Sequence, residues 1–205
     1  MSLFNQFIRT TLPLVPKPVV KLFSKRYVAG PHLEDAVRVA RQLNQNNMSA
    51  TLDILGESTT DKTESENAVN AYLNVLDVID RENLNCGISL KPTQLGMLID
   101  YNFCYQNIKS IVDYAASKQR FVRIDMEDSS VTEKTLQLYE TLRKEYDNVG
   151  IVIQAYLRKS LKHIKQLADE SANFRICKGI YIEPRPIAYR DPQLVNENFT
   201  LLLET

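Results

Sequence analysis

Polar side chains end a series of short apolar runs in this 205-residue chain, and their types suit an anionic or electron-rich ligand. The last run, RICKGIYIEP at residues 175–184, carries Arg175, Lys178 and Tyr181 where a buried strand would be apolar. Cations are costly to bury unless a negative or electron-rich group lies against them. This stretch therefore predicts a binding site for such a group.

The preceding apolar runs end in similar groups. They contribute Asp53 and Glu57 in LDILGE, Lys91 in SLKPTQLG, Asp125, Glu127 and Asp128 in RIDMEDS, and Gln154 in IQAY. Taken singly, each has a structural explanation, such as a helix cap or an ion pair between Arg175 and Asp125. Because five successive strands ending in such groups are hard to obtain by packing alone, we expect the groups to converge on one site.

Alternating strands and helices must position these groups. Apolar and β-branched residues predict strands at residues 49–55, 87–91, 120–126, 150–156 and 174–182. Apolar residues at three-to-four spacing predict helices at residues 32–47, 66–82, 107–118, 129–146, 161–172 and 190–205. Such alternation indicates parallel strands joined by right-handed crossovers, in an open doubly wound sheet or an eightfold barrel.

Within the α/β class, the pattern favours a (β/α)8 TIM barrel. No glycine-rich turn follows the first strand, and polar groups recur at the strand ends, where barrel enzymes keep their chemistry. A closed barrel needs roughly 250 residues, so we expect only about the first five β/α units here. Residues 32–205 are then an incomplete barrel catalytic domain that follows an N-terminal helical arm at residues 1–31.

Composition argues against several other classes. Twenty-five basic residues balance twenty-five acidic ones, so no global field would recruit nucleic acid. Three cysteines without CxxC spacing argue against a disulfide framework or a zinc site, and we expect no metal. No apolar run is long enough to cross a bilayer. The basic, apolar arm suits a membrane-surface contact, a mitochondrial presequence or a helix packed on the fold, of which we favour the last.

Five motifs resemble, in order and spacing, the successive strand signatures of the proline dehydrogenase family. They are LDILGE, ISLKPTQLG, RIDMEDS, GIVIQAYLRKS and RICKGIYIEP, within a resemblance that spans roughly residues 26–205. It is closest to the single-function bacterial type. The resemblance implies a flavoprotein that binds FAD and, in proline catabolism, oxidises L-proline to 1-pyrroline-5-carboxylate by hydride transfer to flavin N5.

The resemblance also implies a role for each polar residue. Lys91 corresponds to the substrate lysine, Asp125 to an acid that orients nearby cations, and Glu57 to a gate residue. The positions that line the cofactor are Gln154, Arg175, Lys178, Gly179 and Tyr181, with Arg175 beside flavin N5. The implied partners are L-proline, a quinone or other electron acceptor, and pyrroline-5-carboxylate dehydrogenase. A cytoplasmic protein with a peripheral contact at the inner membrane is the expected location.

Two other functions stay open on the residues alone. Lys91 or Lys178 could form a Schiff base in a barrel aldolase. The chain could also be a non-catalytic barrel remnant that binds ligands without turnover. The family's later strand motifs would follow residue 205, so we expect a truncated chain that is inactive alone, because a half-open barrel exposes strand edges.

Overall fold

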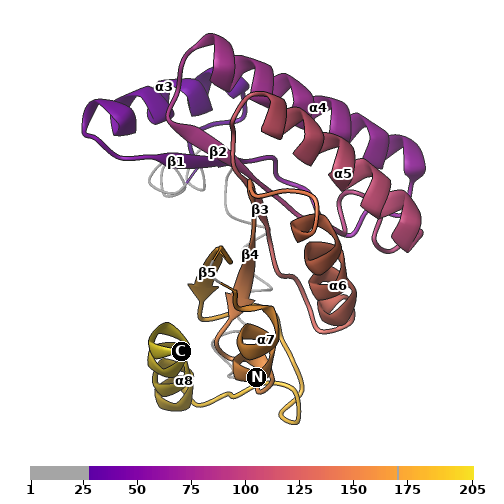
Figure 1. Ribbon diagram of the computed structural model, residues 1–205, viewed down its shortest axis with the longest axis vertical. Helices are drawn as coiled ribbons and strands as arrows, with labels where there is room; N and C mark the ends of the chain where they lie inside the picture. The colour runs from indigo at the N-terminus through magenta and orange to yellow at the C-terminus, as the bar shows by residue number, and fades with distance from the viewer. Residues whose placement is uncertain (1–27, 170) are drawn as a thin grey trace, which may run out of the picture.

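The computed structural model describes residues 28–169 and 171–205, so most of the predicted arm at residues 1–31 lies outside the described residues. Five strands alternate with six helices in the described part (Figure 1). The strands are β1 Ala50–Asp53, β2 Cys86–Leu90, β3 Val122–Ile124, β4 Val149–Gln154 and β5 Phe174–Cys177. The helices are α3 Leu33–Gln45, α4 Lys62–Arg81, α5 Tyr101–Ser117, α6 Thr132–Arg143, α7 Ser160–Leu167 and α8 Pro192–Glu204.

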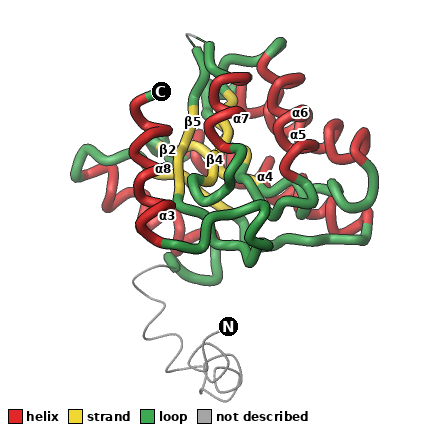
Figure 2. Tube along the Cα trace, turned by 90° about the horizontal axis from the view of Figure 1, so that it is seen from below, coloured by secondary structure: helices red, strands yellow, loops and turns green. Residues whose placement is uncertain are grey.

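The strands form a single parallel sheet in the order β1-β2-β3-β4-β5. Each strand pairs with the next one along the chain, which is the order of a barrel and not of a doubly wound sheet. The sheet curls into a half-barrel, and the helices lie on its outer side around the strands (Figures 1 and 2). The predicted barrel fold, limited to five β/α units, is confirmed.

Aspartate side chains begin three of the helices. Asp61 caps α4, Asp100 caps α5 and Asp191 caps α8, each accepting a hydrogen bond from a backbone N–H in the first turn. An N-cap carboxylate satisfies a donor that has no partner inside the helix and complements the positive end of the helix dipole. Pro192 follows the cap of α8, at a position where its missing N–H is no loss. These caps therefore fix the first residues of α4, α5 and α8.

The core lies between the outer face of the sheet and the helices. Ile88, Leu90, Ile124 and Ile151 point outward from the strands and are fully buried, and α4 contributes Tyr72, Leu76 and Ile79. Every residue of the interior strand β4 is buried, whereas the edge strands β1 and β5 are partly exposed along their length. The inner face of the half-barrel is therefore accessible to a ligand.

The strands are shorter at their C-terminal ends than the sequence predicts, and β5 differs most. It ends at Cys177 and not at residue 182, and Ile180 and Ile182 are 86% and 84% exposed. Gly179 follows with a φ of +101°, in the left-handed region that ends an extended strand. The apolar run thus continues into a loop above the sheet, because one glycine interrupts the strand.

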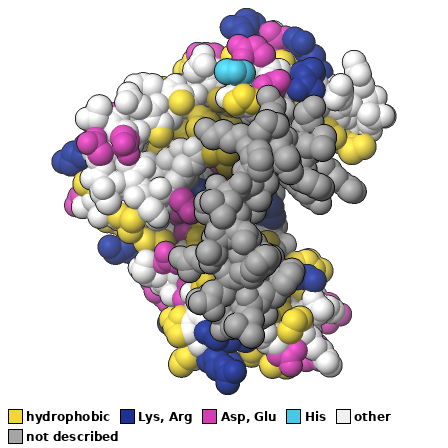
Figure 3. Space-filling view, turned by 180° about the vertical axis from the view of Figure 1, so that it is seen from behind, with side chains coloured by type: hydrophobic (Ala, Val, Ile, Leu, Met, Phe, Trp, Pro, Cys, Tyr) yellow, Lys and Arg dark blue, Asp and Glu magenta, His cyan; other side chains and the backbone are white. Residues whose placement is uncertain are grey.

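Charged side chains of both signs are interspersed over the described surface. On the face seen in Figure 3, patches of lysine and arginine lie beside patches of aspartate and glutamate. This matches the equal numbers of acidic and basic residues in the chain. Among the described helices, none combines the length and the apolar character needed to cross a bilayer.

Candidate active site

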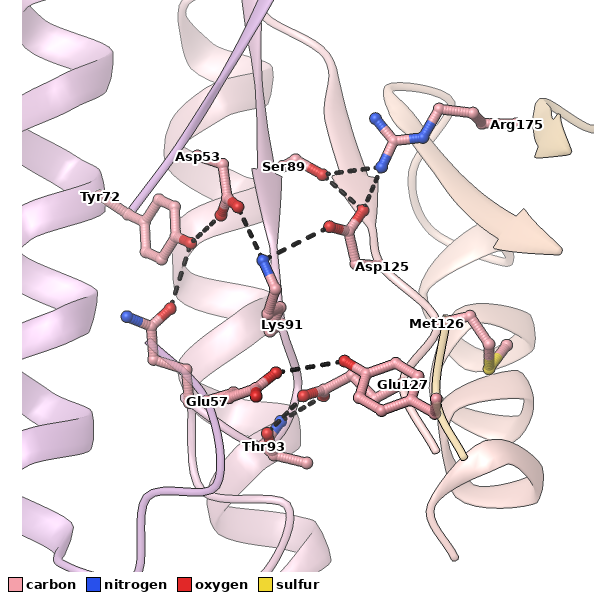
Figure 4. Close-up of polar contacts among 12 residues, drawn as sticks. Asp53, Glu57, Tyr72, Ser89, Lys91, Thr93, Asp125, Met126, Glu127 and Arg175 are labelled. Carbon is pink, nitrogen blue, oxygen red and sulfur yellow. Dashed lines mark hydrogen bonds and ion pairs between the residues drawn. The ribbon is translucent and has the colours of Figure 1, made fainter. Parts of the chain in front are cut away.

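The two-residue period of the strands places the polar groups on the inner face. Asp53 pairs in register with Ser89, Ser89 with Arg123, and Gln154 with Cys177. Side chains two residues apart along a strand point to the same side, so Lys91 and Asp125 follow Ser89 and Arg123 on that face. The predicted convergence is present for Asp53, Lys91, Asp125 and Arg175 (Figure 4), whereas Asp128 accepts hydrogen bonds from Ser130 within its own loop.

Four charged side chains alternate in sign across this face. Lys91 Nζ lies 2.7 Å from Asp53 Oδ2 and 3.7 Å from Asp125 Oδ2. On the other side, Arg175 Nη2 lies 2.5 Å from Asp125 Oδ1, which also accepts a hydrogen bond from Ser89 Oγ at 2.6 Å. The row Asp53, Lys91, Asp125, Arg175 therefore holds both cations in fixed positions (Figure 4).

Asp53 keeps Lys91 in its charged form. Partial burial alone would lower the pKa of Lys91, but the hydrogen bond that Lys91 donates to Asp53 and the charges of Asp53 and Asp125 raise it above the usual value. Asp53 is itself supported from α4, because Tyr72 Oη lies 3.3 Å from Asp53 Oδ1 and 3.2 Å from Gln94 Oε1. Lys91 is thus arranged as a point charge and not as a neutral nucleophile.

A cavity of about 380 Å³ opens above this row of charges. Its lining includes Lys91, Asp125, Gln154, Arg175, Lys178, Gly179 and Tyr181, all of them residues proposed from the sequence. Met126, Val152, Cys177 and Ile180 supply apolar surface. Lys178 makes no ion pair with another described residue, so its charge is available to a ligand.

Gln154 leaves an unsatisfied acceptor at the cavity. Its Nε2 donates to the backbone oxygen of Met126 at 2.9 Å, whereas the buried Oε1 has no hydrogen-bond partner among the described residues. A buried acceptor without a partner is unfavourable, so this amide suits a ligand with an N–H group. The cations Arg175 and Lys178 lie on the same cavity wall and suit a ligand with negative or electron-rich groups.

Glu57 does not line the cavity but contacts a residue that does. Tyr181 Oη donates to Glu57 Oε2 at 3.2 Å and so joins the loop after β1 to the segment after β5. Burial and the charges of Glu127 and Glu57 raise the pKa of Tyr181, which keeps its hydroxyl protonated as a donor. The described part of the rim is therefore bridged between its first and last strands.

Several residues of this network were not assigned from the sequence. Ser89 carries a recognisable signal, because it precedes Lys91 by two residues and must share its face. Asp53 stands at a strand end but had no assigned role. Tyr72 gives no signal, since it occupies one position of the apolar stripe of α4. Thr93, whose backbone N–H donates to Glu127 Oε2 at 2.8 Å, is a loop residue whose contacts depend on the tertiary fold.

A sequence model of a family described as proline dehydrogenase matches residues 36–185, more than half of the chain. The chain belongs to the proline dehydrogenase family. Proline dehydrogenase 1 of Bacillus subtilis (strain 168) is 32% identical over 184 residues, which cover 90% of this chain and 61% of that protein. Proline dehydrogenase of Deinococcus radiodurans is 29% identical over 185 residues, covering 88% of this chain and 60% of the other.

A solved structure supports the same family and fold. Proline utilization A from Bdellovibrio bacteriovorus, in a form inactivated by N-propargylglycine, matches with a TM-score of 0.78 and 25% identity. That match covers 87% of this chain and 23% of the larger protein. The chain spans about 60% of the length of the curated proline dehydrogenases that it matches. The matched region therefore corresponds to only part of a complete proline dehydrogenase.

The aldolase alternative finds no support. A Schiff-base lysine must lose its proton to attack a carbonyl carbon, and enzymes achieve this by lowering its pKa. Here the pKa of Lys91 is raised, with Asp53 and Asp125 as the stabilising charges. A lysine whose charged form is stabilised in this way is poorly suited to attack a carbonyl carbon.

Proposed function

We propose that the natural polypeptide containing these residues is an FAD-dependent proline dehydrogenase. In this reaction the ring carbon of L-proline next to nitrogen loses a hydride, the nitrogen loses a proton, and a C=N bond forms. The observation that supports the proposal most is the row of alternating charges beneath the cavity, in a chain of this family. The row offers fixed cations to a carboxylate on one side and to a cofactor on the other.

Lys91 would bind the carboxylate of proline. Its ammonium group has three donors, two of which face Asp53 and Asp125, so one remains for a ligand in the cavity. The two aspartates hold the lysine in place before substrate arrives, which reduces the entropy lost on binding. Asp125 also fixes Arg175, so one carboxylate orients both the substrate cation and the cofactor cation.

Gln154, Arg175, Lys178, Gly179 and Tyr181 would hold FAD. Within the described part of the chain, the Gln154 oxygen has no partner and Lys178 has no ion pair, so they offer complementary groups for a flavin N–H and for a phosphate. When bound, FAD supplies a two-electron acceptor that takes the hydride at N5. Arg175 would stabilise the negative charge that develops there, because its guanidinium is a cation with several hydrogen-bond donors.

Glu57 would act as a gate at the rim, in keeping with its contact to Tyr181. We extend the proposal to a quinone or another acceptor for the electrons and to pyrroline-5-carboxylate dehydrogenase as the enzyme that takes the product. A cytoplasmic location belongs to the same proposal. The basic arm at residues 1–31 would permit a peripheral membrane contact, and most of that arm lies outside the described residues.

The test is proline-dependent reduction of an artificial electron acceptor by the purified natural polypeptide with FAD. L-prolinamide is a matched substrate, because it keeps the ring and lacks the carboxylate that Lys91 would bind. We expect kcat/KM for L-prolinamide to be lower than for L-proline by at least about tenfold. Equal values would reject Lys91 as the carboxylate partner, and a flavin-loaded protein without proline turnover would reject the function.

A further inference from the structure

Thr93 joins three loops at the rim of the cavity. Its backbone N–H donates to Glu127 Oε2 at 2.8 Å, and its hydroxyl donates to Glu127 Oε1. On the other side, Thr93 Oγ1 accepts from the N–H of Ser58 at 2.8 Å, and the Thr93 carbonyl accepts from the N–H of Thr59 at 3.1 Å. We call Ser58, Thr93 and Glu127 the Thr93 clasp, of which Figure 4 shows Thr93 and Glu127.

The clasp has a definite direction of hydrogen bonding. Thr93 and Glu127 are each 3% exposed, so water cannot replace their partners freely. The Ser58 N–H occupies a lone pair of the Thr93 hydroxyl, and the hydroxyl hydrogen must then point to Glu127. Both carboxylate oxygens of Glu127 accept hydrogen bonds from Thr93, one from the backbone N–H and one from the hydroxyl.

The clasp also holds a strained turn beside Glu57. Ser58 has a φ of +58°, a left-handed conformation that residues with a Cβ rarely adopt. Two consecutive backbone N–H groups, those of Ser58 and Thr59, donate hydrogen bonds to Thr93 and hold this turn in place. The turn directs Glu57 toward Tyr181, whose hydroxyl lies 3.2 Å from the Glu57 carboxylate.

Two of the three loops joined by the clasp carry Lys91 and Glu57, residues of the proposed site. Lys91 precedes Thr93 by two residues, and Glu57 directly precedes Ser58. We propose that Thr93 and Glu127 are positioning residues, which hold Lys91 and Glu57 at the rim of the cavity through the clasp. The role assigned to the clasp in substrate binding rests on the proposed function, whereas the positions of the loops do not.

The first test measures loop order without catalysis. Hydrogen–deuterium exchange of peptides covering residues 54–60 would be compared in wild type, Thr93→Val and Thr93→Ser of the natural polypeptide. Valine keeps the shape and removes the hydroxyl, so we expect exchange at the Ser58 amide to rise about three- to tenfold. Serine should restore wild-type exchange. Thr200→Val is the matched control, because the Thr200 hydroxyl bonds only Asn196 O within its own helix. Unchanged exchange in Thr93→Val would overturn the clasp.

The second test separates positioning from general stability. We expect Thr93→Val to raise KM for L-proline about three- to tenfold with a smaller change in kcat, and Thr93→Ser to recover the wild-type KM. Glu127→Gln should raise KM as well, and the double variant should be no worse than Thr93→Val, because both changes break one clasp. Additive effects, or an unchanged KM, would overturn the positioning role. If wild type does not oxidise proline, the proposed function fails, and the exchange experiment still decides whether the clasp orders the loops.

Discussion

Arg175 and Asp125 form an ion pair that passes over β4. Arg175 lies on β5 and Asp125 follows β3, and the 2.5 Å contact between Nη2 and Oδ1 spans the intervening strand on the inner face. The arginine side chain is 45% exposed, so the pair adds little to stability by itself. Its consequence is orientation, because a long flexible cation is held over the floor of the cavity.

Arg175→Met should lower the reduction potential of the bound flavin and reduce kcat by about a hundredfold or more, because it removes the charge that we propose stabilises the reduced cofactor. Potentiometric titration monitored by flavin absorbance measures the potential. Arg175→Lys keeps a charge but loses the planar fork, and should give an intermediate value. Arg38→Met, on the outer helix α3, is the control. An unchanged potential in Arg175→Met would place the flavin elsewhere.

Lys91→Met should raise KM for L-proline about ten- to hundredfold with a smaller fall in kcat, since it removes the charged hydrogen bond that we propose Lys91 donates to the substrate. Steady-state kinetics over a wide range of proline concentration gives both constants. Lys165→Met makes the same change on the exposed side of α7 and should leave KM unaltered. A wild-type KM in the Lys91 variant would refute its role in binding the carboxylate.

Glu127→Gln should become more stable relative to wild type as pH rises from about 4.5 toward neutrality. Burial raises the pKa of Glu127 above its usual 4.5, although the hydrogen bonds from Thr93 oppose this. Because the folded-state pKa of Glu127 is raised, its protonated form stabilises the native protein. This stabilisation is complete below about pH 4.5 and is lost as the pH rises through the folded-state pKa.

Urea unfolding at several pH values measures that difference in the free energy of unfolding. Glu66→Gln changes an exposed glutamate of α4 and should show no such trend. A Glu127→Gln variant that loses relative stability as pH rises would contradict the assigned burial. If Glu127→Gln shows both this gain in relative stability and a higher KM, the Glu127 carboxylate positions the loops of the clasp at a cost in the free energy of unfolding.

Gly179→Ala should destabilise the fold by about 1–3 kcal/mol and distort the cavity wall. An added Cβ would lie 2.2 Å from the ring of Tyr156, and the φ of +101° is unfavourable for alanine. Thermal unfolding and flavin affinity measure the two effects. Adding Tyr156→Ala should relieve the overlap but not the backbone strain. If Gly179→Ala were as stable as wild type, neither reason for this glycine would hold.

The sequence was sufficient to predict the barrel order and the convergence of Lys91, Asp125 and Arg175, because strand alternation and strand-end polarity are local signals. It was not sufficient to predict which partner each charge takes. Lys91 binds Asp53 more closely than Asp125, and that choice depends on the curl of the sheet. The length of β5 was overestimated, since apolar residues continue past Gly179 into an exposed loop.

Contacts between distant loops were also beyond the reach of sequence patterns. Thr93 and Glu127 are 34 residues apart, and the hydrogen bonds between them arise only once β2 and β3 are paired. Ser58 adopts a left-handed conformation but is neither glycine nor asparagine, so its residue type does not predict that conformation. Such features follow from tertiary structure, which overrides the local preferences of the residues involved.

Anaerobic mixing of the FAD-loaded natural polypeptide with L-proline tests the central claim most directly. The claim is that the charges on the inner face hold proline against an oxidised flavin. We predict that the flavin absorbance bleaches on addition of L-proline, with a half-saturating concentration that rises about ten- to hundredfold in Lys91→Met. A flavin that stays oxidised with excess L-proline, or one that bleaches equally well in the variant, would contradict the account.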